Sequence, residues 1–218
     1  IEYQSGIGEG STFTTAFFPN FSEMNEFFNI TGAGQEYNNP TQELISLFVP
    51  GDTRKEVTVG VPGGFYDADS VFHALPTSTN QTYTKKYFDS SPVRADSKAN
   101  WKVIRYADVL LMYAEALNEN GKPQQAIPFL NQVRTRAGLE GYPNTMSQTE
   151  TRDAIVLERR LELSFEGVRW FDLVRTGKAY EVMKDKGMAP YMTVFPIPLS
   201  QVQIINDPTI FPQNPGYD

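Results

Sequence analysis

The residues best suited to chemistry lie in one charged stretch, ERRLELSFEGVRWFDLVR, residues 158–175. Glycoside hydrolysis requires two carboxyl groups that face each other, one of them with a raised pKa. If the stretch is a helix that turns 100° per residue, its three glutamates and one of its arginines fall within about 100° of arc, next to an arc of apolar residues. The residues of this charged stripe are Glu158, Arg159, Glu162 and Glu166. The stripe therefore borders the face that the helix buries.

These carboxylates require positive charge from another part of the chain. Three acids and one arginine cannot be desolvated together, because unpaired buried carboxylates take up protons instead. Arginine suits the task, since its planar guanidinium can hold a carboxylate with two parallel hydrogen bonds. We predict that at least one of the three glutamates contacts an arginine from a different helix. The candidates in neighbouring predicted helices are Arg105, Arg134, Arg136, Arg169 and Arg175. We favour structural ion pairing, with acid–base catalysis and a partner interface as alternatives.

Histidine chemistry and phosphate chemistry have little support. His73 is the only histidine, and the FHALP segment around it lacks a nucleophile signature. A catalytic triad has only this histidine to use, and a zinc site with two helical histidines is excluded. GIGEG, residues 6–10, lacks the following helix whose N-terminus binds phosphate in nucleotide sites. We expect no cofactor and assign no metal site.

A second candidate site lies in loop-like sequence rich in aromatic residues. Tyr66, Phe72 and Tyr83 alternate there with polar residues that include Asp67 and Asn80. Sugar sites use flat rings for stacking, and carboxylate and amide groups to bind hydroxyls. We therefore predict these five residues as ligand contacts. The alternative is that the rings pin irregular loops to the core.

Composition narrows the function classes. The chain has 218 residues, 40% of them hydrophobic, and a net charge of −7, with no basic run that could neutralise phosphates. Nucleic acid is therefore not an expected partner. The longest apolar run, VLLM, is far shorter than the ~20 residues that span a bilayer. The chain begins with Ile1 and carries no recognisable targeting segment, so we expect a processed or truncated piece.

The elements that must position these residues change in character at Trp101. Residues 1–100 read as loops with short elements, including a helix that opens at Pro40 or Thr41. From residue 101, apolar residues recur at helical spacing in two helices joined by NENGKP, which resemble one tetratricopeptide helix pair. A third helix begins at the SQTE capping box and is predicted to run to Gly167. Another follows, broken at Thr176 and Gly177, and the proline-rich ending is predicted to be an ordered but irregular tail.

Three blocks of the sequence carry a resemblance to a known family. They are IRYADVLLMYAEALNENGKPQQAIPFLNQVRTRAGL, IVLERRLELSFEGVRWFDLVRTGK and FPIPLSQVQIINDPTIFPQNPGY, and PTQELISLFVPGDTRKEVTVG and KKYFD extend the likeness upstream. In this order and spacing they resemble the C-terminal half of the SusD/RagB family. The resemblance implies a mostly α fold, a SusD-like superhelix of tetratricopeptide-like helix pairs with a loop-rich region and an irregular tail. We treat 1–218 as one such region, with 1–100 loop-rich and facing the ligand and 101–218 forming the helical scaffold and tail.

The resemblance also implies a function and a cellular context. Family members are outer-membrane lipoproteins of Bacteroidetes that bind glycans or other nutrients and act as a lid on a SusC-like TonB-dependent transporter. Compared with them, this chain lacks the N-terminal half and its lipidated cysteine, so we expect a fragment whose partners include that missing half. No ligand-binding residue carries over by motif. What does match is the charged framework, which looks structural in the family: Arg105, Glu115, Arg134, Glu158, Arg159, Glu162, Arg169 and Asp172, to which the stripe adds Glu166.

We therefore expect a non-enzymatic nutrient-binding protein at the bacterial cell surface, with an oligosaccharide as its ligand and delivery to the transporter as its task. Two alternatives remain open at this point. The chain could be a tetratricopeptide-like scaffold that binds proteins and no small ligand. A glycoside hydrolase is the less favoured alternative.

Overall fold

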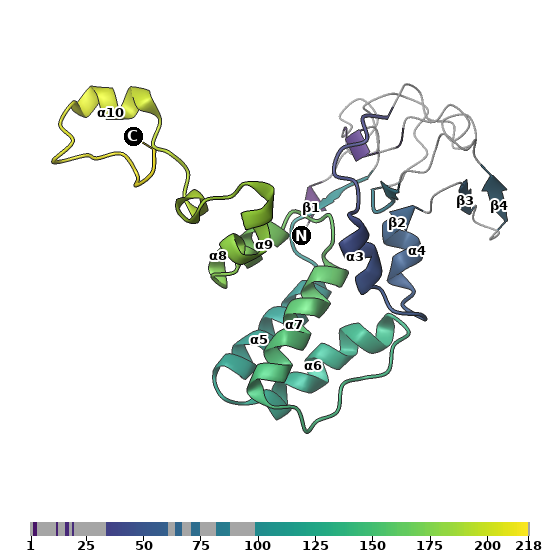
Figure 1. Ribbon diagram of the computed structural model, residues 1–218. Helices are drawn as coiled ribbons and strands as arrows, with labels where there is room; N and C mark the ends of the chain where they lie inside the picture. The colour runs from purple at the N-terminus through teal and green to yellow at the C-terminus, as the bar shows by residue number, and fades with distance from the viewer. Residues whose placement is uncertain are drawn as a thin grey trace. The chain divides into compact units, whose positions relative to one another are not determined.

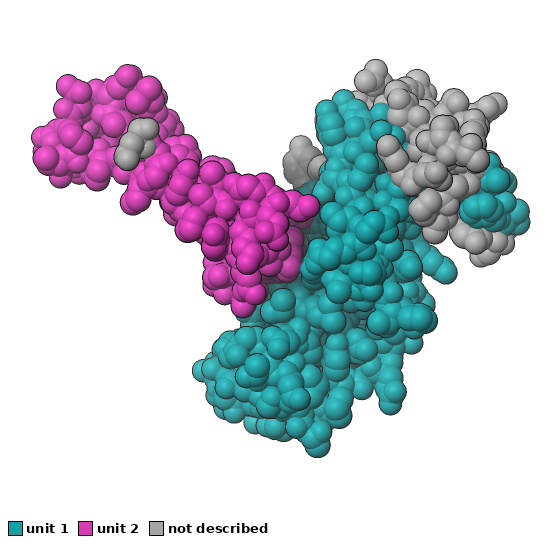
Figure 2. Space-filling view, in the orientation of Figure 1, with its two compact units in different colours: residues 1–166 teal, residues 167–218 magenta. Residues whose placement is uncertain are grey.

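The computed structural model describes residues 2–3, 12, 16–17, 19, 34–60, 64–66, 71–74, 82–87 and 99–217 (Figure 1). Contacts divide the chain into two compact units, residues 1–166 and 167–218, which Figure 2 colours separately. The change in sequence character at Trp101 lies inside the first unit. The described part is mostly helical, as predicted, with short strands confined to the first half of the chain.

Three helices form the centre of the first unit: α5 (Tyr106–Glu119), α6 (Pro123–Arg136) and α7 (Gln148–Glu162). The predicted helix pair is confirmed as α5 and α6, joined by a tight turn in which Gly121 has a φ of 73° and Pro123 opens α6. Ala114 and Ala126 are fully buried between the helices, and Ile155 of α7 packs into the same core. Small residues let the helices of the pair approach closely, and α7 covers a face that the pair cannot bury alone.

Helix α7 begins as predicted and ends earlier than predicted. The side chain of Ser147 accepts the Glu150 main-chain N–H, and the Glu150 carboxylate accepts the Ser147 N–H at 2.8 Å, completing the capping box. The helix ends at Glu162 rather than continuing to Gly167, and a turn follows in which Phe165 has a φ of 65°. Glu166 therefore leaves the helix axis and reaches its partners from a turn.

Two short helices precede the helical core. In α3 (Gln42–Leu47), the Thr41 hydroxyl accepts the Leu44 N–H at 3.2 Å, which confirms the predicted start. Phe48, just after α3, is buried with Leu161 of α7. Helix α4 (Arg54–Thr58) follows, and Thr53 at its start donates its main-chain N–H to the Ala137 carbonyl at 3.1 Å. This bond fixes the start of α4 to the end of α6.

Within the described ranges, the strands form three antiparallel pairs, with two or three residues in each strand. β1 (Glu2–Tyr3) pairs with β6 (Trp101–Lys102), and β2 (Val59–Gly60) pairs with β5 (Tyr83–Thr84). β3 (Gly64–Tyr66) pairs with β4 (Phe72–Ala74). Pairs this short lack a large hydrophobic face of their own, so they depend on the packing around them.

The second unit contains α8 (Arg169–Arg175), α9 (Ala179–Met183), two 3₁₀ turns (η1, Lys184–Lys186, and η2, Pro190–Thr193) and α10 (Leu199–Ile205). The break between α8 and α9 at Thr176 and Gly177 is confirmed. The tail is less irregular than predicted, because α10 forms directly after Pro198. Side-chain bonds hold the rest of the tail: Gln213 bonds both main-chain groups of Ile197, and the Tyr217 hydroxyl donates to the Val194 carbonyl at 2.8 Å.

Candidate functional site

The three glutamates of the charged stripe lie in the interior of the first unit. Glu158 is 0% exposed, Glu162 4% and Glu166 9%. Each one forms an ion pair with a cation from another element, so the prediction of an arginine from a different helix is confirmed. Buried carboxylates persist in charged form only with such partners.

Glu162 has three arginine partners that come from three parts of the fold. Arg105, just before α5, donates to it at 2.8 Å, and Arg136 in the last turn of α6 donates at 2.6 Å. Arg54 of α4 lies 3.4 Å away. Burial acts to raise the pKa of the Glu162 carboxyl, but these arginines outweigh it and lower the pKa. Glu162 is therefore a charged junction between α4, α5, α6 and α7.

Glu158 and Arg54 form the most deeply buried part of the cluster. Arg54 binds Glu158 and also holds Asp52 through two hydrogen bonds of 2.8 and 2.7 Å. Burial raises the pKa of the Glu158 carboxyl, against the opposing charges of Arg54 and Arg134. Burial acts to lower the pKa of Arg54, but the hydrogen bond that Arg54 donates to Asp52 and the charges of Asp52 and Glu158 raise it overall. Arg54 therefore stays charged, and its charge acts against the effect of burial on the pKa of Glu158.

Glu166 joins the cluster from the turn after α7. Its carboxylate accepts two hydrogen bonds from Arg105, at 2.7 and 2.9 Å, and pairs with the Lys86 ammonium. Lys86 also donates to the main-chain carbonyls of Glu162 and Ser164. Burial lowers the pKa of the Lys86 ammonium, and the nearby positive charge of Arg105 acts in the same direction.

The other residues of the predicted charged framework have different ion-pair partners. Arg159 pairs with Asp108 of α5 at 2.8 Å, and Arg134 lies 3.5 Å from Glu158 with its guanidinium over the Tyr142 ring. Asp172 pairs with Arg175 within the second unit. Roles for Glu115, Arg169 and Asp172 in this framework stay predictions.

Sequence reasoning missed three members of the cluster: Asp52, Arg54 and Lys86. The helical spacing indicated that cations must arrive, but it pointed only to arginines on helices. GDTR, residues 51–54, carries two charges directly after a helix stop and was the available signal. Only the fold shows that this turn docks against α6 and α7.

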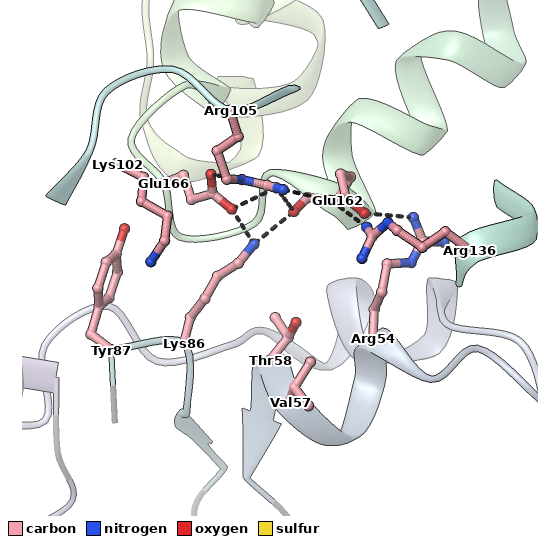
Figure 3. Close-up of a pocket in the computed structure, with 10 residues that line it drawn as sticks. All are labelled: Arg54, Val57, Thr58, Lys86, Tyr87, Lys102, Arg105, Arg136, Glu162 and Glu166. Atoms are coloured by element: carbon pink, nitrogen blue, oxygen red, sulfur yellow. Dashed lines mark hydrogen bonds and ion pairs between the residues drawn. The ribbon is translucent and has the colours of Figure 1, made fainter. Parts of the chain in front are cut away.

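A pocket of about 200 Å³ opens beside the cluster (Figure 3). Arg54, Glu162 and Glu166 lie in its buried part, whereas Lys102 and the largely exposed Arg136 lie toward solvent. The described residues that line it include five cations and two carboxylates: Arg54, Lys86, Lys102, Arg105, Arg136, Glu162 and Glu166. The pocket is therefore positively charged, in a protein whose net charge is −7.

The predicted ligand-contacting residues are only partly described. Phe72 on β4 is 46% exposed, but Tyr83 on β5 is 2% exposed and its ring covers Gly60 of the facing strand. Such burial suits packing better than contact with a ligand in this conformation. Asp67, Asn80 and the side chain of Tyr66 lie outside the described residues.

Histidine and metal chemistry find no geometric support in the described part of the chain. His73 lies half-buried in β4, with an exposed neighbour on either side. Within the described ranges, no three His, Cys, Asp or Glu side chains are placed to hold a metal ion.

The helix pair and its covering helix define a mostly α-helical protein, and solved SusD-like proteins share this fold. A model of the SusD family matches residues 19–217, and the chain belongs to that family. SusD-like protein P38 of Formosa agariphila is 36% identical over 156 residues, which cover 68% of this chain and 28% of that protein. This chain thus spans less than a third of that relative.

Two solved structures extend the comparison. A laminarin binding SusD-like protein is 30% identical, with a TM-score of 0.67, and the match covers all of this chain and 49% of that one. Surface glycan-binding protein A from Bacteroides thetaiotaomicron has a TM-score of 0.73 at 23% identity, over 99% of this chain and 51% of that one. The second likeness shows the fold alone. The chain spans about half of each solved protein.

Proposed function

We propose that this chain is part of a non-enzymatic protein that binds a nutrient at the bacterial cell surface, with an oligosaccharide as the ligand. One observation carries the proposal: the whole chain aligns with a solved SusD-like protein whose name states that it binds laminarin, at 30% identity. Membership of the SusD family supports the same reading. The exposed ring of Phe72 in the loop-rich part offers a surface on which a sugar can stack.

The proposal includes a partner and a location. The nutrient is handed to a SusC-like TonB-dependent transporter, and the protein is held on the outer face of the outer membrane by a lipid anchor on sequence outside this chain. Both parts rest on family resemblance. None of the described helices has the length and apolar character that crossing a membrane requires.

The buried carboxylates argue against the glycoside hydrolase alternative. The catalytic acid of a glycoside hydrolase has a raised pKa so that it holds a proton, and it must contact the substrate so that it can donate this proton to the glycosidic oxygen. Glu158 has a raised pKa, but it is 0% exposed, bound to Arg54, and does not line the pocket. Its raised pKa is therefore a result of burial in an ion-pair cluster.

Binding of the chain to immobilised β-glucans and other neutral glycans tests the proposal, with laminarin as the first probe. We expect weak, saturable binding without release of new reducing ends, because stacking and hydrogen bonds to sugars compete with water. Turnover that disappears in Glu158→Gln would overturn the non-enzymatic reading. Binding of peptides with no binding of any glycan would favour the scaffold alternative.

A further inference from the structure

The pocket beside the charged cluster contains more positive charge than its own carboxylates can neutralise. Five cations and two carboxylates line it. Asp52 and Glu158 lie behind Arg54, and Arg134 lies against Glu158, so the wider set comprises six cations and four carboxylates. The other charged pairs around it, Arg159 with Asp108 and Lys85 with Glu56, are balanced. Glu2 lies opposite Lys102 in the β1–β6 pair and adds a fifth carboxylate, so a surplus of one positive charge remains among the described residues.

The surplus is located where a ligand can reach it. In the buried part, Arg54 and Arg105 are occupied by glutamates. Lys102 on β6 lines the same pocket from its exposed edge and forms no ion pair with a side chain that the structure describes. Figure 3 shows the side chains of Lys86, Lys102 and Arg105 around one space. An ammonium group at the edge of this space, with further cations behind it, is an arrangement that attracts an anion.

We infer that this pocket binds the oxyanion group of a small ligand, a carboxylate or a sulfate, with Lys102 as its direct contact and Lys86 and Arg136 as supporting charges. An oxyanion offers several acceptor oxygens to such converging donors, and charge-assisted hydrogen bonds are about twice as strong as neutral ones. Burial is the main cause of the lowered pKa of Lys86, and a bound anion would favour the charged form of that ammonium.

The size of the pocket limits what can enter. Pockets that hold a drug-sized ligand measure roughly 300–1,000 Å³, and this one is about 200 Å³. It can accept a charged group, or one acidic sugar unit, but not a glycan chain. The ligand is therefore small, or it inserts only a charged substituent.

This inference does not depend on the proposed function, because the pocket is built from the helical core and the segments against it rather than from the residues predicted to contact glycans. Binding of a neutral glycan and binding of an anion are separate measurements. Either can fail while the other succeeds.

Titration calorimetry on the 218-residue chain tests the inference with two probes, sodium sulfate and sodium galacturonate, at constant ionic strength. Neutral galactose is the matched ligand control. The test variant is Lys102→Glu, and the matched protein control is Lys122→Glu, at the far end of α5 from Arg105. A helix of 14 residues is about 21 Å long, well beyond the Debye length of about 8 Å at physiological salt.

We expect at least one of the two anions to bind and galactose to show no measurable binding. Lys102→Glu should weaken anion binding by about tenfold or more. Lys122→Glu should stay within about twofold of the unsubstituted chain. The preferred probe identifies the carboxylate or the sulfate as the better ligand. No binding of either anion, equal binding of galactose, or equal losses in the two variants would overturn the inference. Lys102→Met, which removes the charge without reversing it, should show an intermediate loss and separates charge loss from misfolding.

Discussion

The guanidinium of Arg105 donates one hydrogen bond to the Glu162 carboxylate at 2.8 Å and another to the main-chain carbonyl of the same residue at 2.9 Å. Glu162 is the last residue of α7, where helix carbonyls lack partners within the helix. One side chain at the start of α5 therefore neutralises a buried charge and caps the end of α7. This double contact joins the start of α5 to the end of α7 through two residues that are 57 positions apart in the chain.

Removing this arginine should destabilise the first unit strongly. Arg105→Ala leaves two carboxylates, Glu162 and Glu166, without their best partner in a buried setting, and breaking a buried pair costs about 3–5 kcal/mol. Because the Arg105 side chain is 22% exposed, we expect about 3 kcal/mol, at the lower end of that range. Urea unfolding followed by circular dichroism measures the change.

The matched control is Arg152→Ala, which breaks an ion pair with Glu119 between two exposed side chains. Its unfolding midpoint should stay close to that of the unsubstituted chain, because exposed pairs contribute little. Equal effects of the two substitutions would show that burial does not decide the strength of these pairs.

A pH dependence follows from Glu162. Its arginine partners lower its pKa below the ordinary value of 4.5, so the unfolded chain binds a proton at higher pH than the folded chain. The stability from this group is complete above about pH 4.5 and is lost as the pH falls through the folded pKa. Glu162→Gln cannot titrate, so its free energy of unfolding should fall less between about pH 5 and about pH 3 than that of the unsubstituted chain.

The absolute stability of Glu162→Gln will be lower, so only the slope against pH is informative. Glu140→Gln, at an exposed position outside the helices, serves as the comparison and should keep the slope of the unsubstituted chain. Parallel curves for all three proteins would contradict the role given to Glu162.

Sequence reasoning succeeded where periodicity and capping chemistry determine the structure. Helix α7 was expected at its observed start because Ser147 and Glu150 form a box within one turn. The end of α7 was not predicted, because the turn after it contains Phe165 with a positive φ, which residues other than glycine rarely adopt. The need for cations at Glu158 could be read from helix geometry, but Arg54 could not be identified as the donor. That pairing spans 104 residues and depends on how α4 docks.

The loop-rich part shows the opposite limit. Phe72 and Tyr83 look equivalent in sequence, as aromatic residues in loop-like sequence. Each ring packs over a glycine of the paired strand, Tyr83 over Gly60 and Phe72 over Gly64. The fold separates the two residues by exposure, because Tyr83 is 2% exposed and Phe72 is 46% exposed. Composition indicates which residue types a binding site uses but not which rings become buried.

The close approach of α5 and α6 depends on small residues. Ala126→Leu adds a branched side chain at a position that is 0% exposed, and overpacking of this kind costs about 1–3 kcal/mol. For a chain of this size, each kcal/mol lowers the melting temperature by about 2–4 °C. Ala116→Leu places the same side chain on the exposed face of α5 and should leave the melting temperature nearly unchanged. A thermal scan of both variants decides whether packing or composition sets the stability of this pair.

The last prediction separates ligand contact from packing among the aromatic residues. Phe72→Ala should weaken glycan binding by about 0.5–1.5 kcal/mol, the contribution of one aromatic contact beyond area burial, while the melting temperature changes little. Tyr83→Ala should instead destabilise the chain by about 3 kcal/mol, because a buried ring is lost. Phe171→Ala removes a ring that is 70% exposed in the second unit and should change neither quantity. Affinity for laminarin and melting temperature, measured on all three variants, distinguish the two roles.

The assignment would be reversed if Tyr83→Ala lost glycan binding at an unchanged melting temperature while Phe72→Ala kept full binding. Because Phe72 of β4 is paired with Tyr66 of β3, a contact role for Phe72 would also place the ligand beside that strand pair.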